Sequence, residues 1–208
     1  MNITILGPTG RTGRELVDQA LDAGHRVTAL TRDESALILR ERLTIVAGSL
    51  SDSRALDCAF AGSDAVLCAL GGRPWRRRER VCSTALRHAL PSIAKHRIRR
   101  IVAISTFGAG ETRAQLGWIA RSLLFGMLLR SELKDKEAME AQLAASDLQW
   151  TTVRVGVLTD DAPRGRWRAA DDGSIGAMGE IARADVAAFM LAALRDNTWI
   201  RRSPSLMY

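Results

Sequence analysis

The 208-residue sequence is poor in the residues that define several classes of protein. Its three cysteines are odd in number and lack metal-ligand spacing, which disfavours a disulfide framework and predicts reduced thiols. Its three histidines are scattered along the chain, so we predict no metal site. No run of roughly 18 apolar residues is present, and Met1 leads directly into an apolar strand pattern rather than a signal peptide. We therefore expect a cytoplasmic protein that does not span a membrane.

Lysine is also scarce, because only Lys95, Lys134 and Lys136 stand among the 30 basic residues and arginine supplies the rest of the net charge of +7. Such a charge suits either nucleic acid or anionic cofactors and substrates, and composition does not decide between them. Five arginines surround Trp75, namely Arg73, Arg76, Arg77, Arg78 and Arg80. We interpret them as the solvated rim of a ligand crevice and do not expect nucleic acid, because the cluster lacks a recognised nucleic-acid motif.

A glycine-rich segment follows the first apolar run of the chain. Residues 3–6 predict a buried strand, and residues 14–21 predict a helix that ends near Gly24. Between them stand Gly7, Thr9, Gly10, Arg11, Thr12 and Gly13. Small residues let the backbone approach a pyrophosphate, whose charge then meets the free N–H groups and the positive end of the helix dipole. Strand, glycine turn and helix predict a dinucleotide-binding loop, with an ordinary tight turn as the alternative.

The residue after the second predicted strand, at residues 26–31, is Arg32. An acidic residue at this point accepts hydrogen bonds from the ribose hydroxyls of NAD, whereas an arginine suits the ribose phosphate of NADP. Arg11 in the glycine loop would add a second positive charge. The sequence therefore predicts NADP(H) rather than NAD(H), and a solvent-exposed arginine is the alternative for either residue.

Strand and helix patterns alternate along the chain. Further strands are predicted at residues 43–47, 64–70, 101–106 and 150–158, and helices at residues 56–60, 81–95, 133–145 and from 181 onward. Residues 160–179 predict loops with room for a short strand. This order predicts one domain over residues 1–208, with an α/β, Rossmann-type doubly wound parallel sheet and a small C-terminal substrate-side portion. Ligands of such sheets bind beyond the carboxyl ends of the strands.

Residues 116–129 form the most apolar stretch of the sequence. The stretch is too short to span a bilayer, and Arg121 interrupts it. The sequence leaves open a lid over a hydrophobic substrate, a helix that forms a dimer, and plain burial. We assign residues 107–132 and 156–180 to the substrate side of the sheet, and we expect a monomer or a homodimer.

Several of these segments together resemble the atypical short-chain dehydrogenase/reductases, in the NmrA-like and biliverdin reductase B (flavin reductase) branch. The resemblance rests on the glycine loop, Arg32, residues 48–50 and 69–73, residues 140–151 with Arg154, and residues 181–187. It covers residues 1–194. The residues to which it gives cofactor contacts are Ser49, Leu50, Leu70, Gly71, Gly72 and Arg73, in addition to the glycine loop and Arg32.

The sequence departs from the family pattern at three points. Ser49 replaces an aspartate, and Val155 replaces a proline of the sixth strand. Enzymes with a tyrosine and a lysine four residues apart would place the lysine at Lys136, but the tyrosine position holds Glu132, and the single tyrosine is Tyr208. A phenol beside a lysine normally protonates a carbonyl oxygen, and a carboxylate is usually ionised at neutral pH.

The resemblance implies an NADPH-dependent oxidoreductase that passes hydride directly to a small acceptor such as a flavin, quinone or tetrapyrrole, which takes its proton from solvent. Ser105 and Thr106 would orient the nicotinamide or the acceptor, with strand-end capping as the alternative. Lys136 would contact the nicotinamide ribose, with an exposed helix lysine as the alternative. A raised pKa would instead make Glu132 a general acid. Two other functions remain open. One is a non-catalytic NADP-binding redox sensor. The other is a sugar-nucleotide epimerase or dehydratase, and the missing tyrosine disfavours this second function.

Overall fold

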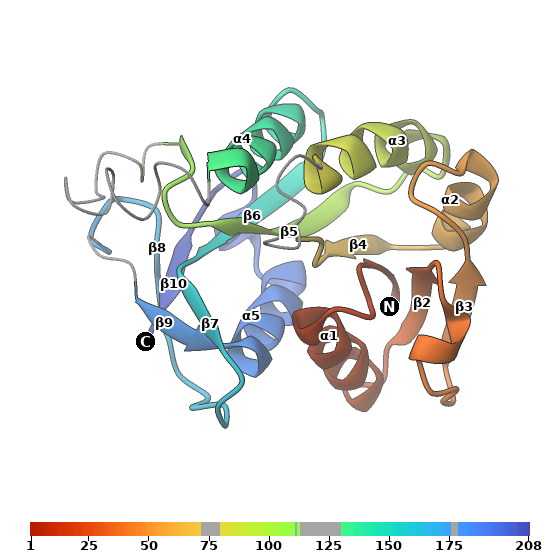
Figure 1. The fold of residues 1–208 in the computed structure, drawn as a ribbon, viewed down its shortest axis with the longest axis horizontal. Coiled ribbons are helices and arrows are strands. Elements are labelled where there is room, and N and C mark those ends of the chain that lie inside the picture. Colours follow the sequence, from red (N-terminus) through yellow and green to blue (C-terminus); the bar gives the residue numbers. More distant parts are fainter. Residues whose placement is uncertain (72–79, 111, 113–129, 176–178) are drawn as a thin grey trace.

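The computed structural model describes residues 1–71, 80–110, 112, 130–175 and 179–208 (Figure 1). The strands among them are β1 (Asn2–Leu6), β2 (Arg26–Thr31), β3 (Leu43–Ala47), β4 (Ala65–Cys68), β5 (Arg100–Thr106), β6 (Gln149–Val155), β7 (Val157–Thr159), β8 (Arg168–Ala170), β9 (Glu180–Ala182) and β10 (Ser205–Met207). The helices are α1 (Arg11–Asp22), α2 (Ser53–Phe60), α3 (Val81–Lys95), α4 (Arg130–Ala144) and α5 (Arg183–Arg195), with short 3₁₀ turns η1 (Glu34–Ala36) and η4 (Asn197–Trp199).

The main sheet has the strand order β3-β2-β1-β4-β5-β6-β10-β8 among the described residues. All neighbouring pairs are parallel except β10 and β8. The chain runs outward from β1 to β3 and then returns to the other side of β1 with β4. This reversal confirms the predicted Rossmann-type doubly wound sheet.

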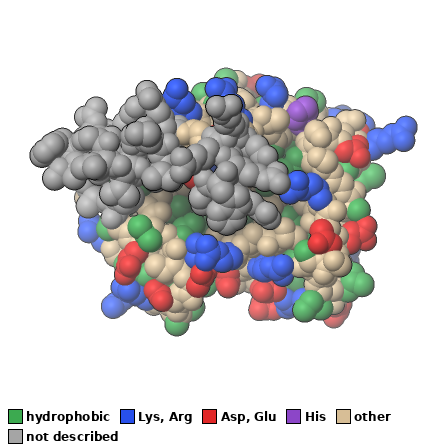
Figure 2. All heavy atoms as spheres, in the orientation of Figure 1, with side chains coloured by type: hydrophobic (Ala, Val, Ile, Leu, Met, Phe, Trp, Pro, Cys, Tyr) green, Lys and Arg blue, Asp and Glu red, His purple; other side chains and the backbone are tan. Residues whose placement is uncertain are grey.

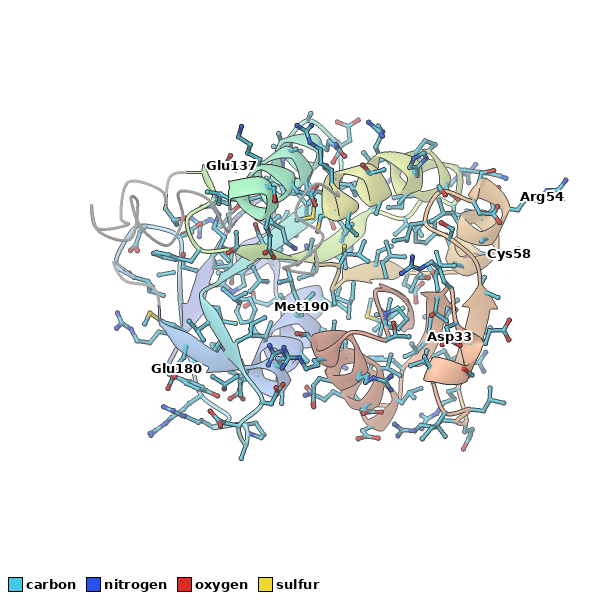
Figure 3. The ribbon with its side chains drawn as sticks, in the orientation of Figure 1. Asp33, Arg54, Cys58, Glu137, Glu180 and Met190 are labelled. Carbon is cyan, nitrogen blue, oxygen red and sulfur yellow. The ribbon has the colours of Figure 1, made fainter. Side chains whose placement is uncertain are left out.

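Helices cover both faces of this sheet. Figure 1 shows α2, α3 and α4 above the sheet and α1 and α5 below it. Successive side chains of β1 enter different cores, because Ile5 packs with residues of α1 and α5 whereas Leu6 packs with residues of α2, α3 and α4. Met190 of α5 points toward the sheet and is fully buried (Figure 3). The two-sided cover explains why β4 and β5 read as continuous apolar runs rather than as alternating ones.

The predicted strand at residues 150–158 and the predicted last helix have different bounds in the structure. The strand predicted over residues 150–158 is two strands, because β6 ends at Val155 and Val157 begins β7, which pairs with β9 rather than with the main sheet. The predicted last helix begins at Arg183, since Ile181 belongs to β9 and its side chain is fully buried. The room left for a short strand within residues 160–179 is taken by β8.

Some predictions fall on residues outside those described. These are the roles of Gly72 and Arg73, the arginine cluster around Trp75 apart from Arg80, and the apolar residues 116–129. None of the described helices combines the length and apolar character needed to cross a bilayer. Within the described part of the chain, no histidine, cysteine and acidic side chains gather in a group that would hold a metal ion. Figure 2 shows basic and acidic side chains interspersed on the lower part of the visible face.

Candidate cofactor site

The strands β1 to β6 end at one edge of the sheet, and the loops that follow them lie next to one another. Leu6 at the end of β1 is opposite Cys68 of β4. Beyond this pair, a β-carbon added to Gly7 would lie 3.0 Å from the carbonyl oxygen of Ala69, so the glycine loop contacts the segment that leads to Leu70. The strand order reverses between β1 and β4, and open sheets of this kind bind ligands at such a switch point.

The glycine loop depends on close contacts that a side chain would prevent. Gly7 has a φ of +80°, a left-handed conformation that favours glycine. The amide of Gly10 donates to the carbonyl oxygen of Gly7 at 3.2 Å, and the carbonyl oxygen of Gly10 accepts from the amide of Arg14 at 2.8 Å. A β-carbon on Gly13 would lie only 1.9 Å from the same Gly7 oxygen. The tight passage from β1 into α1 therefore requires a glycine at position 13.

The first turn of α1 offers its amide groups to an anion. No side chain in the described part of the chain caps this end of the helix, and its first turn holds no acidic residue. The first N–H groups of a helix have no acceptor within the helix, and the helix dipole places partial positive charge there. Thr12 is buried and Thr9 is half-buried at this turn. This is the arrangement that binds phosphate groups in dinucleotide-binding folds.

Arg11, predicted as a phosphate contact, lies at this turn and forms an ion pair. Its Nη1 is 2.6 Å from Oδ2 of Asp160, which follows β7. Nη1 of Arg183, the first residue of α5, is 2.6 Å from the other carboxylate oxygen. Sequence reasoning missed both partners, because they lie about 150 and 170 positions further along the chain.

Arg32 is exposed immediately after β2. The acid beside it, Asp33, is drawn in Figure 3 next to the turn that follows β2. One oxygen of its carboxylate accepts hydrogen bonds from the amide of Ser35 at 3.0 Å and from its hydroxyl at 2.6 Å. Asp33 thus caps η1, while the guanidinium of Arg32 faces solvent at the end of the strand.

The segment after β3 forms a turn held by its own hydroxyl groups. The side chain of Ser49 is exposed, and its oxygen lies 3.0 Å from the Ser51 hydroxyl. Leu50 is half-buried against the core under α2 and α3. A β-carbon on Gly48 would lie 2.2 Å from that of Ala55, so glycine allows α2 to pack against this turn. Ser49 and Leu50, which the family resemblance gives as cofactor contacts, therefore lie at the same edge of the sheet as Arg32.

Lys136 is buried, with 3% of its surface exposed, so the alternative of an exposed lysine is wrong. Its ammonium donates to the carbonyl oxygens of Leu70 at 2.8 Å and Ile104 at 2.6 Å. It thereby joins the ends of β4 and β5 beside the glycine loop. The nearby thiols are poor nucleophiles, because burial raises the pKa of Cys68 and raises that of Cys82 to about 12. Gly71, next to Leu70, is exposed.

Ser105 and Thr106, predicted to act together, lie on opposite faces of β5. Ser105 shares the α4 face with Arg154, its partner across the strand pair, and is 1% exposed. Its hydroxyl has no hydrogen-bond partner among the described residues. Thr106 is half-buried on the other face, and its hydroxyl lies 3.4 Å from the carbonyl oxygen of Phe107. The two hydroxyl groups therefore face opposite sides of the sheet and have different neighbours.

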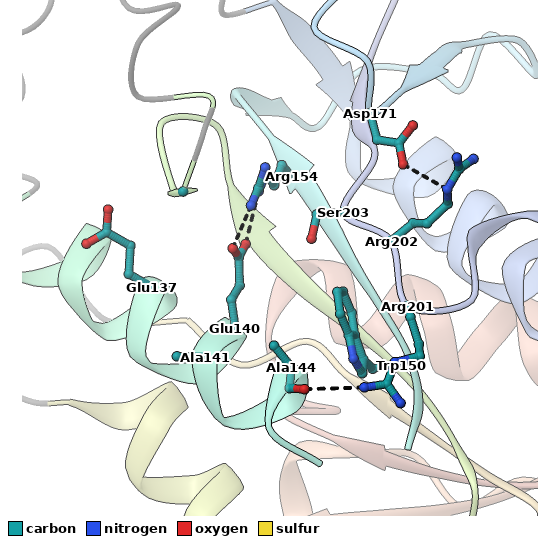
Figure 4. A pocket seen from close by; sticks show the side chains of 11 residues that line it. Glu137, Glu140, Ala141, Ala144, Trp150, Arg154, Asp171, Arg201, Arg202 and Ser203 are labelled. Carbon is teal, nitrogen blue, oxygen red and sulfur yellow. Dashed lines mark hydrogen bonds and ion pairs between the residues drawn. The ribbon is translucent and has the colours of Figure 1, made fainter. Parts of the chain in front are cut away.

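A separate hollow of about 490 Å³ lies between α4, β6 and the residues before β10 (Figure 4). Its basic side chains are held by partners in its own wall. Nε and Nη2 of Arg154 lie 3.1 and 2.8 Å from the carboxylate of Glu140, and Arg202 pairs with Asp171 at 3.1 Å. A β-carbon on Gly110 would lie 2.6 Å from Nη2 of Arg154. The ion pair thus fixes α4 to β6 and supports the loop after β5, which accounts structurally for residues 140–154 of the family pattern.

Tyr208, the single tyrosine, is tied to the other family segment. Its hydroxyl donates to Oδ2 of Asp185 at 2.6 Å and accepts from the amide of Ala182 at 3.1 Å. Asp185 is 1% exposed and also accepts from the amides of Arg164 and Gly165. Burial and the Asp185 hydrogen bond raise the pKa of Tyr208. Asp185 therefore anchors the C-terminal strand and the loop before β8, and the phenol is committed to that contact.

Comparisons with known proteins agree with this geometry. A family model described as NAD(P)H-binding matches residues 7–197. The photosystem II assembly factor Ycf39 of Synechocystis is 39% identical over 75 residues, which are 35% of this chain and 23% of that protein, so the match spans about a quarter of the relative's length.

Two solved structures share the whole fold at low sequence identity. ChuY, described as an anaerobilin reductase of Escherichia coli O157:H7, has a TM-score of 0.83 and 22% identity, covering 100% of this chain and 97% of its own. A short-chain dehydrogenase/reductase of Veillonella parvula in complex with NADP has a TM-score of 0.82 and 20% identity, covering 100% and 94%. With its glycine loop, uncapped α1 and matched family model, the chain belongs to the NAD(P)H-binding family of Rossmann-fold proteins.

Proposed function

We propose that the protein is an NADPH-dependent oxidoreductase that transfers a hydride directly to a small acceptor such as a flavin, a quinone or a tetrapyrrole. The observation that carries this proposal is the hydrogen bond from the Tyr208 hydroxyl to Asp185. Tyr208 is the single tyrosine of the sequence, so the sheet edge that would bind the cofactor has the buried Lys136 but no phenol beside it. An acceptor of this class takes its proton from solvent, so hydride transfer needs no acidic side chain. The cofactor supplies the hydride, and the protein supplies binding and orientation.

The described residues divide this work among them. The uncapped amides of α1 would hold the pyrophosphate, and Arg32 would pair with the ribose phosphate of NADPH. Ser105 would orient the nicotinamide or the acceptor. Lys136 would keep the ends of β4 and β5 together next to the nicotinamide ribose. The descriptions of the two structural neighbours, one as a reductase and one in complex with NADP, support the proposed NADPH-dependent reaction.

A second candidate is a non-catalytic NADP-binding sensor, which the similarity to an assembly factor and the missing catalytic tyrosine favour. Stopped-flow measurement of NADPH oxidation against a panel of flavins, quinones and tetrapyrroles separates the two. Turnover with any acceptor supports the enzyme, whereas tight NADPH binding without oxidation by the whole panel supports the sensor.

We expect Arg32→Ala to weaken NADPH binding about tenfold to a hundredfold while NADH binding is unchanged. The reason is that a charge-assisted bond to the ribose phosphate contributes about 1.5–3 kcal/mol, and NADH lacks that phosphate. The measurement is a fluorescence titration with both cofactors. Arg54→Ala is the matched control, because Arg54 of α2 projects away from the molecule (Figure 3). An equal loss for both cofactors would assign Arg32 a structural role.

We expect Ser105→Ala to lower kcat about tenfold with the best acceptor, because a looser contact disturbs the geometry of hydride transfer. Glu132, half-buried in the first turn of α4, is not needed as an acid in this mechanism, so Glu132→Gln should change kcat less than about threefold. Thr106→Ala removes the hydroxyl group on the opposite face of β5, so its kcat shows whether that face also contributes to hydride transfer. A loss of about a hundredfold at Glu132 alone would contradict direct transfer and make Glu132 the proton donor.

A further inference from the structure

One carboxylate, that of Asp160, lies between two arginines at the edge of the glycine loop. Its Oδ2 is 2.6 Å from Nη1 of Arg11, and its Oδ1 is 2.6 Å from Nη1 of Arg183. Each carboxylate oxygen therefore serves a different guanidinium. The side chains of Arg11 and Asp160 are 69% and 58% exposed, whereas that of Arg183 is only 12% exposed.

The three residues come from distant parts of the chain and meet at the start of α1. Arg11 is the first residue of that helix, Asp160 directly follows β7, and Arg183 is the first residue of α5. No side chain among the described residues caps the first turn of α1, and the first residue of this helix, Arg11, holds the carboxylate of Asp160. An anion bound at this turn would therefore meet the same residue, Arg11, that holds Asp160.

The carboxylate is ionised at neutral pH. Desolvation raises the pKa of Asp160, but the hydrogen bond from Arg11 and the charges of Arg183 and Arg11 outweigh it and hold the pKa below its usual value. An ionised carboxylate with two guanidinium partners offers the same contacts as two oxygens of a phosphate group. Like charges repel, so Asp160 and a bound pyrophosphate oppose each other at this position.

We propose that Asp160 is an internal counter-anion that competes with the pyrophosphate of the dinucleotide for Arg11. Without a dinucleotide, Asp160 holds Arg11 and Arg183; when the pyrophosphate binds at α1, Arg11 exchanges the carboxylate for a phosphate oxygen, and Arg183 retains Asp160. Exposed ion pairs contribute little to stability, so breaking the Arg11–Asp160 pair costs little free energy. Asp160 thereby sets the affinity for every dinucleotide that carries a pyrophosphate, whereas Arg32 would distinguish NADPH from NADH. The inference rests on the proposed binding of a nicotinamide dinucleotide.

The test is a titration of wild type and Asp160→Asn with NADPH and with NADH, at low and at high salt. We expect Asp160→Asn to bind both cofactors more tightly by the same factor, about threefold to tenfold at low salt, with the gain shrinking as added ions screen the charges. Asp161→Asn is the matched control, because it removes the same charge one residue away. Asp161 is exposed and forms no ion pair among the described residues, so its effect should stay within about twofold.

A second pair of variants tests the route through Arg11. In Arg11→Ala, the further change Asp160→Asn should give less than half of its gain in the wild type, because the contested guanidinium is gone. Thermal melting checks that each variant is folded. We expect Asp160→Asn to fold, because the side chain of Asp160 is 58% exposed. Equal or weaker binding by Asp160→Asn would overturn the inference, as would a gain confined to NADPH. A wild type that binds neither cofactor would reject the proposed function and this inference together, whereas a wild type that binds without the gain rejects this inference alone.

Discussion

Gly13→Ala is expected to abolish dinucleotide binding, with a loss of at least about a hundredfold in affinity. The added β-carbon would lie 1.9 Å from the carbonyl oxygen of Gly7 and 2.9 Å from its carbonyl carbon. Gly7 has little room to yield, because its own φ is +80° and a β-carbon there would already approach Ala69 at 3.0 Å. The turn must therefore open, which moves the first amides of α1 away from the end of β1 and from the pyrophosphate.

Gly10→Ala provides the control for this change. Gly10 has a φ of −68°, and its β-carbon would lie 3.4 Å from the oxygen of Gly7, so the fold tolerates alanine there. Its melting temperature should match that of the wild type, and any loss of NADPH affinity would report the approach of the ligand to the backbone alone. A folded Gly13→Ala variant with wild-type NADPH affinity would show that the cofactor does not depend on this turn.

Where helices cover the sheet on both sides, the sequence predicts the strands closely. The strand at residues 43–47 and the helix at residues 81–95 have the predicted bounds, and Gly24, with a φ of +83°, follows the end of α1 as expected. The apolar runs of β4 and β5 are unbroken because both of their faces are buried, whereas β3 lies at the sheet edge and is partly exposed. The short strands β7, β9 and β10 have no apolar run of this kind that would predict their pairing. Each is three residues long, and its pairing partner is chosen by tertiary contacts rather than by its own pattern.

The buried polar side of α4 could not be predicted from periodicity. Asp135, Lys136 and Glu140 all face other parts of the protein, yet polar residues normally mark the solvent side of a helix. Their partners are carbonyl groups, amides and Arg154, which only the folded chain brings within reach. The spacing of Lys136 and Glu140, four residues apart, indicates that they share a face of the helix, and the family resemblance singles out both positions.

The largest loss of stability is expected from Asp135→Ala. Asp135 of α4 is 3% exposed, and its carboxylate accepts from the amides of Cys82 and Ser83 at 2.8 and 2.9 Å and from the Ser83 hydroxyl at 2.5 Å. The residue before α3, Arg80, gives that helix no side-chain cap, so the cap comes from the neighbouring helix instead. Alanine would leave three buried donors without this acceptor, at a cost of about 3–5 kcal/mol in the free energy of unfolding.

Urea unfolding of Asp135→Ala, Asp135→Asn and Asp147→Ala tests this expectation. Asparagine retains one oxygen acceptor without the charge, so its loss should be intermediate, and Asp147 is exposed beyond α4, so its replacement should cost less than about 0.5 kcal/mol. A second effect follows from the neighbour of Asp135. Lys136 bridges Leu70 and Ile104, so a shift of α4 loosens the ends of β4 and β5 and should also weaken NADPH binding in the fraction that remains folded. An Asp135→Ala variant within about 1 kcal/mol of the wild type would mean that solvent or another group satisfies the start of α3 without α4.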